Sequence, residues 1–270
     1  MTMDKKFRLP KDIPLEEYPA PETYLSESRR LIEEASNHKI ILRVMGPIAI
    51  HLYFPEYVEV YRKMEHLGER VFTDIDYASY GKHRGKIVSF FQSQGYEIEK
   101  RSMILSGGTR HIFFSDKIPM IDVFYDQLAY NHQIDYRGRL EIHPHCVSLT
   151  DLLLQKLQIV FINDKDLKDA MLLLLASRVS ETDDTGINLR YLSKLLGDDW
   201  GFYYTATTNL IKIKEAVYSV SILTQEQCNQ IRVNADRILD GIEKAPKSGG
   251  WKRRAKTGTS KIWYNEITDW

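Results

Sequence analysis

The chain has 270 residues, of which 43% are hydrophobic, and this is enough apolar material for a sizeable core. Its 37 basic and 37 acidic side chains cancel, so no overall charge draws the molecule onto nucleic acid or a membrane. Only two cysteines occur, Cys146 and Cys228, and their distant positions argue against a disulfide framework or a thiolate zinc site. Since no long apolar stretch is present, we expect a cytoplasmic protein that does not enter the membrane.

The amino-terminal part of the chain is rich in proline. Prolines from Pro10 to Pro21 predict an extended arm over residues 1–25, because proline does not fit a helix interior or a central strand. A short helix is expected after it, with Ser26 or Ser28 as its N-cap. Regular structure is thus expected to begin near residue 26.

A strand-to-helix turn is expected at Gly46. The preceding run KIILRVM is short and rich in branched side chains, which is typical of a buried strand. Pro47 follows, and proline suits the first position of a helix because its missing N–H would have no partner there. The backbone should therefore turn sharply at Gly46.

The next segments predict a mixed sheet with helices. We expect a helix in GKIVSFFQSQG, a hairpin around Gly107 and Gly108, and strands in VFTDIDYAS, KIPMIDVFYD and RGRLEIH. From Ser148 onward the apolar spacing is helical, with Ser148 or Thr150 as a cap. The fold class is therefore α+β. We expect an arm (1–25), a mixed α/β core (26–147), a helical domain (148–245) and a basic, flexible tail (246–270).

Three aspartates suggest a metal site. Asp74 and Asp76 lie two residues apart on an expected strand, so their side chains should project from one face. Asp122 lies in another apolar strand, where a lone carboxylate would be costly to bury. Three such carboxylates suit Mg²⁺, which prefers oxygen ligands and bridges carboxylates to substrate phosphates.

The spacing Asp-x-Asp is weak evidence by itself. Asp164 and Asp166 have it inside an expected helix, and an isolated pair at a strand end is more often solvated. The context of Asp74 and Asp76 favours a site, because a strand–glycine–helix unit with backbone N–H groups suited to phosphate precedes them.

A family resemblance follows from the order of these motifs. The chain resembles the DNA polymerase β-type nucleotidyltransferase superfamily in Gly46-Pro-Ile-Ala49, Arg70-x-x-Thr73-Asp74-Ile75-Asp76 and Ile121-Asp122-Val123. The segment LLLQKLQIVFINDKDLKDAMLLLL resembles helical motifs of the AbiEii toxin type and of unassigned bacterial nucleotidyltransferase-like proteins. The resemblance extends from about Lys39 to Leu175, so the core would be of nucleotidyltransferase type.

The resemblance implies a set of site residues. Mg²⁺ or Mn²⁺ and the triphosphate would be bound by Asp74, Asp76 and Asp122, and Asp122 would also help accept a proton. Phosphate would be contacted by Lys156, and the following acidic motif falls at Asp166 or Asp169. The expected nucleotide-binding residues are Gly46, Arg70, Thr73, Lys156, Asp166 and Asp169. The simpler interpretation is that the charged residues on these expected helices form ordinary surface ion pairs, for example Lys165 with Asp169 at i, i+4 spacing.

The resemblance implies transfer of a nucleoside monophosphate from a triphosphate to an RNA end (tRNA-like) or a protein hydroxyl, as in a toxin with an antitoxin partner. Pro47 replaces the second small residue of the family's turn and removes one N–H. A catalytically silent protein that binds a nucleotide or a partner is therefore the alternative. A third hypothesis is an enzyme that nucleotidylates a small antibiotic-type molecule.

The carboxy-terminal segment carries a basic run beside an aromatic residue. Lys252, Arg253, Arg254 and Lys256 lie close to Trp251. Such a run suits an RNA backbone with a stacking ring, although short basic segments are more often solvated.

Overall fold

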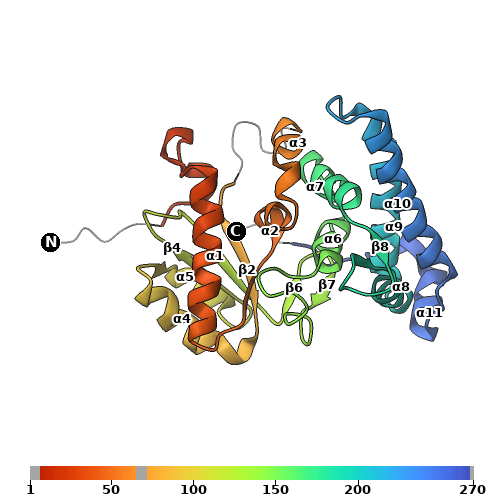
Figure 1. Cartoon of the computed structure of the whole chain (residues 1–270). Helices are drawn as coiled ribbons and strands as arrows, with labels where there is room; N and C mark the ends of the chain where they lie inside the picture. Colours follow the sequence, from red (N-terminus) through yellow and green to blue (C-terminus); the bar gives the residue numbers. More distant parts are fainter. Residues whose placement is uncertain (1–6, 65–71, 268–270) are drawn as a thin grey trace. The chain divides into compact units, whose positions relative to one another are not determined.

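The computed structural model describes residues 7–64 and 72–267, which form two compact units (Figure 1). The first unit contains the described residues of Met1–Leu52, Leu67–Leu128 and Asp135–Val147. The second contains those of Tyr53–His66, Ala129–Ile134 and Ser148–Trp270. The α+β class is confirmed, while the exact domain bounds given above stay a prediction. No helix in the described ranges is long and apolar enough to cross a membrane.

The first unit is built on a mixed sheet with the strand order β1-β2-β5-β4-β3. The neighbouring strands β2 and β5 are parallel, and the other neighbouring strands are antiparallel. The parallel pair brings the two acidic motifs onto neighbouring strands. The strands are β1 (Leu42–Val44), β2 (Ile75–Ser79), β3 (Glu97–Ile98), β4 (Arg110–Phe114) and β5 (Ile121–Tyr125).

Helices α1 (Pro21–Asn37) and α4 (Arg84–Ser93) cover the sheet face on which Tyr77 lies. The Tyr77 hydroxyl donates to the Ser28 carbonyl of α1 at 3.2 Å, and its ring lies 6.3 Å from that of Phe91 in α4. Because side chains alternate along a strand, Asp76 projects from the opposite face. The candidate site therefore lies on the face that α1 and α4 leave uncovered.

The expected extended arm is wrong in its second part. Two 3₁₀ turns, Pro10–Asp12 and Leu15–Glu17, are followed directly by α1, which begins at Pro21. Proline fits the first turn of a helix, where its missing N–H has no intrahelical partner. The predicted N-caps, Ser26 and Ser28, lie inside the helix instead.

The predicted hairpin around Gly107 and Gly108 is also wrong in part. Strands β3 and β4 pair in antiparallel fashion, but helix α5 (Lys100–Ser106) lies between them. The Glu99 carboxylate caps this helix by accepting from the Arg101 N–H at 3.0 Å. Residues Lys100–Ser106, which were expected to form part of the first strand of the hairpin, therefore form a capped helix.

The segment RGRLEIH, predicted as a strand, forms turns. Gly138 has a left-handed φ of +72°, and the Tyr80 hydroxyl oxygen accepts from the N–H groups of Gly138 at 3.2 Å and Leu140 at 3.3 Å. A side chain therefore satisfies the backbone donors that a strand would have given to a neighbour.

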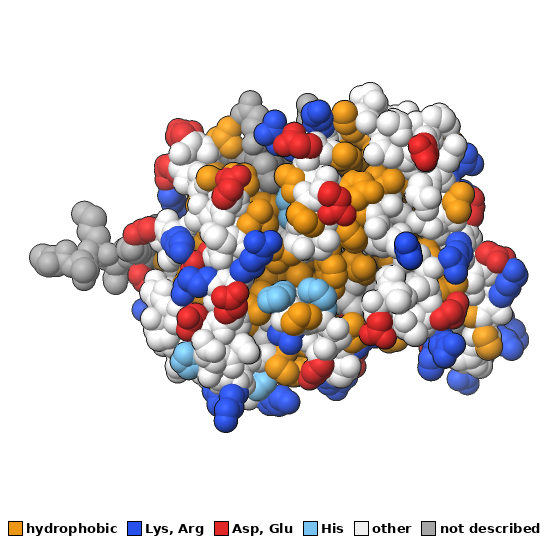
Figure 2. Space-filling model, in the orientation of Figure 1, with side chains coloured by type: hydrophobic (Ala, Val, Ile, Leu, Met, Phe, Trp, Pro, Cys, Tyr) orange, Lys and Arg blue, Asp and Glu red, His pale blue; other side chains and the backbone are white. Residues whose placement is uncertain are grey.

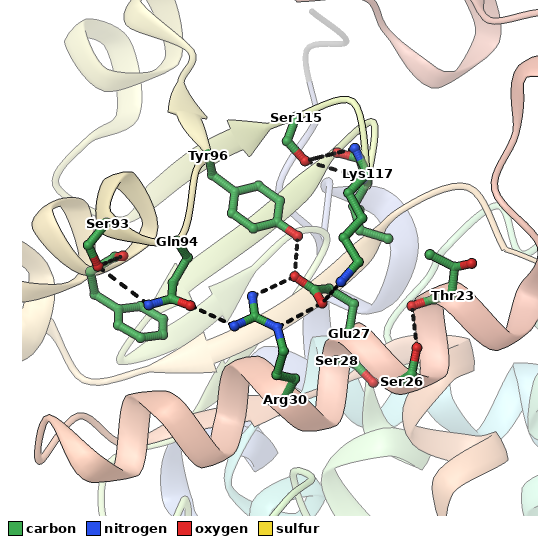
Figure 3. A network of polar contacts seen from close by, with 12 residues as sticks. Thr23, Ser26, Glu27, Ser28, Arg30, Ser93, Gln94, Tyr96, Ser115 and Lys117 are labelled. Atoms are coloured by element: carbon green, nitrogen blue, oxygen red, sulfur yellow. Dashed lines mark hydrogen bonds and ion pairs between the residues drawn. The ribbon is translucent and has the colours of Figure 1, made fainter.

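A buried carboxylate fastens α1 to the sheet (Figure 3). Glu27 is 1% exposed and accepts from the Arg30 guanidinium at 2.7 and 2.9 Å and from the Tyr96 hydroxyl at 2.8 Å. The Lys117 ammonium also pairs with it, and Arg30 donates to the Gln94 side chain at 2.6 Å. Burial opposes the charge of Glu27, but these donors outweigh it and lower its pKa to about 2.

The second unit is mainly helical, and its helices start at well-defined caps. Ser148 caps α6 as predicted, accepting from the Asp151 N–H at 3.1 Å. Thr224 and Gln227 form a reciprocal capping box at the start of α10. The helices are α3 (Val58–Lys63), α6 (Leu149–Leu157), α7 (Asp164–Ala176), α8 (Leu189–Asp198), α9 (Trp200–Ala216), α10 (Gln225–Lys244) and α11 (Gly249–Thr257).

The basic tail, expected to be flexible, contains helix α11 and is fastened to the second unit. The Asn265 N–H donates to the Asn131 carbonyl at 2.9 Å, and the Trp263 indole N–H donates to the Thr205 hydroxyl at 3.0 Å. The remaining short strands are β6 (Gln127–Ala129), β7 (Gln133–Asp135), β8 (Val179–Ser180) and β9 (Ile187–Asn188).

Candidate functional site

The expected turn at Gly46 is present and lies against Asp76. Strand β1 ends at Val44, and helix α2 (Gly46–Tyr53) begins at Gly46, whose φ is +66°. A Cβ placed on Gly46 would lie 3.2 Å from Asp76 Oδ2, and the left-handed φ would strain any other residue. Glycine thus allows the start of α2 to approach the Asp76 carboxylate.

The sheet places Asp76 and Asp122 side by side. They are register partners on the parallel strands β2 and β5, so their side chains share one face of the sheet. Asp76 is half-buried, whereas Asp122 is only 2% exposed. The register therefore places these two residues opposite each other on neighbouring strands.

Asp74 lies just before β2. Its Oδ1 accepts from the Thr73 hydroxyl at 3.1 Å, and the Thr73 carbonyl accepts from the Tyr24 hydroxyl at 3.4 Å. Burial, and then the charge of Asp74, raise the pKa of Tyr24, so the phenol stays protonated beside the site. Arg70, predicted to lie near the nucleotide, is outside the described residues.

Arg110 holds Asp122. Its Nε donates to Oδ1 at 2.7 Å and to Oδ2 at 2.9 Å, and its Nη2 also donates to Oδ2. The guanidinium lies 5.2 Å from the centre of the Phe124 ring. Burial raises the pKa of Asp122 to about 6, with a further contribution from Asp74, while Arg110 acts in the opposite direction.

The positions of Asp74, Asp76 and Asp122 can be compared with the predicted metal centre. Within the ranges that the structure describes, no group of three or more His, Cys, Asp or Glu side chains could hold a metal ion. Asp74 and Asp76 offer the oxygen ligands that Mg²⁺ prefers, and substrate phosphates would complete its coordination. Asp122 fits less well because both its oxygens accept from Arg110. The metal-binding roles of all three residues stay predictions.

A second ionic cluster lies in the second unit. Lys156 Nζ on α6 lies 2.8 Å from Asp166 Oδ1 and 2.8 Å from Asp169 Oδ2, both on α7. Lys156 is 8% exposed and Asp169 fully buried, and Tyr61 donates its hydroxyl to Asp169 Oδ1 at 2.6 Å. Burial disfavours the ammonium, but the two carboxylates prevail and raise the pKa of Lys156.

The cluster unites three predicted residues and changes their interpretation. Asp169 pairs with Lys156, rather than with Lys165 as the simpler interpretation suggested, and the surface pair of α7 joins Lys168 to Asp164 at 2.5 Å. Holding α6 to α7 is therefore one role of Lys156. Its contact with phosphate stays a prediction, as do the nucleotide-binding roles of Gly46, Thr73, Asp166 and Asp169.

Two residues of these clusters, Arg110 and Tyr61, were not predicted. The sequence around Arg110 gives no sign of an acidic neighbour, and Tyr61 is 108 residues from Asp169. His143, near the buried Cys146, accepts from the Cys146 N–H at 3.0 Å through Nδ1. It stabilises a turn.

Comparisons with known proteins give one weak similarity. No family model matches the chain, and no curated protein matches it. Among solved structures, the solution structure of the antibiotic-resistance factor ANT(2'')-Ia is similar over 82% of this chain and 95% of that chain. The sequence identity is 12% and the TM-score 0.34, values too low to support any conclusion on fold or activity.

Proposed function

We propose that this protein is a Mg²⁺-dependent nucleotidyltransferase that transfers a nucleoside monophosphate from a triphosphate to an acceptor hydroxyl. The observation that supports it best is the contact between the Gly46 turn and Asp76, with Asp122 in register on the next parallel strand. A helix start with its backbone N–H groups thus adjoins the acidic motif, which suits phosphates bridged to carboxylates through a cation.

The residues have distinct roles in this proposal. Asp74 and Asp76 would hold the metal ion, which supplies positive charge beside the reacting phosphates. The acceptor oxygen bonds to the α-phosphorus, the bond from that phosphorus to pyrophosphate breaks, and pyrophosphate leaves with the electron pair. Asp122 would take the hydroxyl proton, for which a pKa of about 6 is suitable near neutral pH.

The test is transfer of label from each of the four α-labelled nucleoside triphosphates with Mg²⁺ or Mn²⁺. Total RNA, total protein and a small polyhydroxylated antibiotic serve as separate acceptors, so the assay also distinguishes the three acceptor classes. We expect Asp74→Asn/Asp76→Asn to abolish transfer. The matched control, Asp12→Asn/Glu16→Gln, changes two exposed carboxylates and should keep it. Equal labelling by the wild type and the first variant contradicts the proposal.

A catalytically silent nucleotide-binding protein is the second candidate, and the Arg110–Asp122 pair favours it. Both oxygens of Asp122 accept from Arg110, so Asp122 is not available as a third carboxylate ligand of a metal ion. Pro47 also removes one backbone N–H from the turn that would bind phosphate. Calorimetric titration with Mg²⁺ and a triphosphate separates the candidates, because binding without transfer to any acceptor favours the silent protein. A toxin-like role and an antitoxin partner are part of the proposal only through the family resemblance.

A further inference from the structure

The segment from Pro246 to Asn265 is strongly basic within a chain that has no net charge. It contains no aspartate or glutamate and has six cationic residues, which are Lys247, Lys252, Arg253, Arg254, Lys256 and Lys261. Lysine and arginine side chains gather over α11 in Figure 2. This part of the molecule therefore has a local positive field that the total charge does not reveal.

Two of these cations have structural roles. Arg254 donates through Nη1 to the Gly258 carbonyl at 2.7 Å and through Nη2 to the Lys261 carbonyl at 2.9 Å. Its guanidinium lies 4.9 Å from the centre of the Trp200 ring. Lys247 donates to the Ala245 carbonyl at 3.1 Å, near the end of α10. These contacts fix the segment in place.

The other four cations are exposed, and we call them the α11 cation group: Lys252, Arg253, Lys256 and Lys261. Among the described residues, their side chains have no ion pair or hydrogen bond. Two exposed lysines on neighbouring helices of this unit are paired, Lys194 with Asp198 at 2.8 Å and Lys244 with Asp240 at 2.6 Å. The group therefore has charge available for an external polyanion.

A series of aromatic rings begins beside the same segment. The Trp200 ring, under Arg254, stacks on Tyr204 with centroids 5.3 Å apart and an interplanar angle of 17°. From Tyr204 the ring contacts continue through Trp263 at 5.1 Å and Tyr264 at 5.2 Å to Phe161 at 6.2 Å. Tyr204 is 36% exposed and Phe161 80% exposed, so these two rings of the series are accessible to a ligand.

We propose that this surface binds single-stranded nucleic acid. The α11 cation group would contact successive phosphates, and unpaired bases would stack on Tyr204 and Phe161, because cationic tracks with adjacent aromatic rings suit single strands. A duplex offers no base faces to such rings. A lipid surface is the competing class of partner, because Ile262 and Phe161 are exposed near the cations, and vesicles are therefore included in the test.

This inference concerns binding and does not require catalysis. If the proposed transfer reaction occurs, the surface would favour an RNA over a protein acceptor, and that step rests on the proposed function. Asp74→Asn/Asp76→Asn should therefore bind a strand as tightly as the wild type, whether or not it transfers nucleotides. Loss of transfer and loss of strand binding are separate results.

The test measures fluorescence anisotropy of a labelled mixed-sequence RNA of about 20 nucleotides, with the matching single-stranded DNA and an RNA duplex as further probes. Four phosphate contacts predict about 50-fold weaker binding when salt rises from about 50 to about 200 mM. Replacing the whole α11 cation group by glutamine should remove most of the affinity and of this salt dependence. Equal affinity for both single strands supports the general form of the proposal, and preference for RNA supports an RNA-specific one.

A matched control distinguishes binding at this surface from a general effect of losing four positive charges. Lys39→Gln/Lys86→Gln/Lys100→Gln/Arg101→Gln removes four exposed cations from the first unit and should leave binding nearly unchanged. Phe161→Ala, at a largely exposed ring, should weaken single-strand binding by about tenfold without changing the fold. The proposal is overturned if the control weakens binding as much as the α11 variant, if duplex binds as tightly as single strand, or if only vesicles with about one third phosphatidylserine bind.

Discussion

Two ionic clusters, around Asp122 in the first unit and around Lys156 in the second, differ in their balance of charges. Asp122 of the first unit has one cationic partner, Arg110, and its pKa is raised to about 6 mainly by burial. Lys156 of the second unit has two anionic partners, Asp166 and Asp169, and its pKa is raised although burial acts against the ammonium. In the first cluster, the effect of burial on the pKa of Asp122 is larger than the opposing effect of Arg110. In the second, the effect of the two carboxylates on the pKa of Lys156 is larger than that of burial.

The difference indicates different uses of buried charge. Lys156 stays charged throughout the ordinary pH range, so its cluster acts as a fixed connection between α6 and α7. Burial raises the pKa of Asp122 to about 6, closer to neutral than the ordinary value of an aspartate, and the proposed reaction uses this carboxylate as the proton acceptor. Of the two clusters, only the Asp122 cluster has a proton-transfer role in the proposed reaction.

The largest expected effect comes from breaking the second cluster. Lys156→Met leaves the fully buried Asp169 without its cation, and the free energy of unfolding should fall by about 3–5 kcal/mol. Urea unfolding measures this. Lys194→Met, in an exposed pair, should change stability by less than about 0.5 kcal/mol. Asp169→Asn added to Lys156→Met should recover part of the loss, and equal stability of Lys156→Met and the wild type would refute the fixed connection.

Breaking the first cluster should cost less, because Asp122 can take up a proton. Arg110→Met removes the partner that opposes burial, so the pKa of Asp122 should rise further above 6, and stability at neutral pH should fall by about 1–3 kcal/mol. A folded-state pKa above the ordinary 3.8 means that this group destabilises the fold as pH rises through 4 to 6, and over a wider pH range in the variant. NMR titration of the Asp122 carboxyl measures the pKa, and Arg137→Met, beside the exposed Asp135, is the control.

The sequence predicted the parts of the candidate site that follow from local pattern. The period of two placed Asp74 and Asp76 together, the glycine and proline marked the turn at Gly46, and a lone acid in an apolar strand marked Asp122. Arg110 was beyond this reasoning, because its position beside Asp122 depends on how β4 pairs with β5. Strand register is a property of the assembled sheet.

The cluster around Lys156 also depends on packing that the sequence does not reveal, here between residues farther apart in the chain. Helical spacing identified Lys156, Asp166 and Asp169, but only the packing of α6 on α7 decides that they meet one another. Tyr61 joins them from α3, far away in the sequence. Similarly, the cap that Glu99 provides for α5 outweighed the hairpin signal of Gly107 and Gly108, which lie directly after that helix.

A third ionic cluster, around Glu27, should show an intermediate effect with an acid dependence. Because the folded-state pKa of about 2 lies below the ordinary 4.5, the stabilisation is complete above pH 4.5 and disappears as pH falls towards 2. Its cations are half exposed, so Glu27→Gln should cost only about 1–2 kcal/mol at pH 7. Urea unfolding of both proteins at several pH values measures this, and a difference that persists at pH 2 would exclude the mechanism.

The smallest effect is expected at Asp164, which shares helix α7 with Asp166. Asp164 is 76% exposed and pairs with Lys168, whereas Asp166 is 14% exposed and pairs with Lys156. Asp164→Asn should therefore cost about 0.5 kcal/mol, the usual value for a surface pair in a first helical turn, and Asp166→Asn clearly more. Urea unfolding of the two variants compares identical side chains two residues apart. Equal losses would mean that helix position, and not burial against Lys156, decides what a carboxylate contributes in this unit.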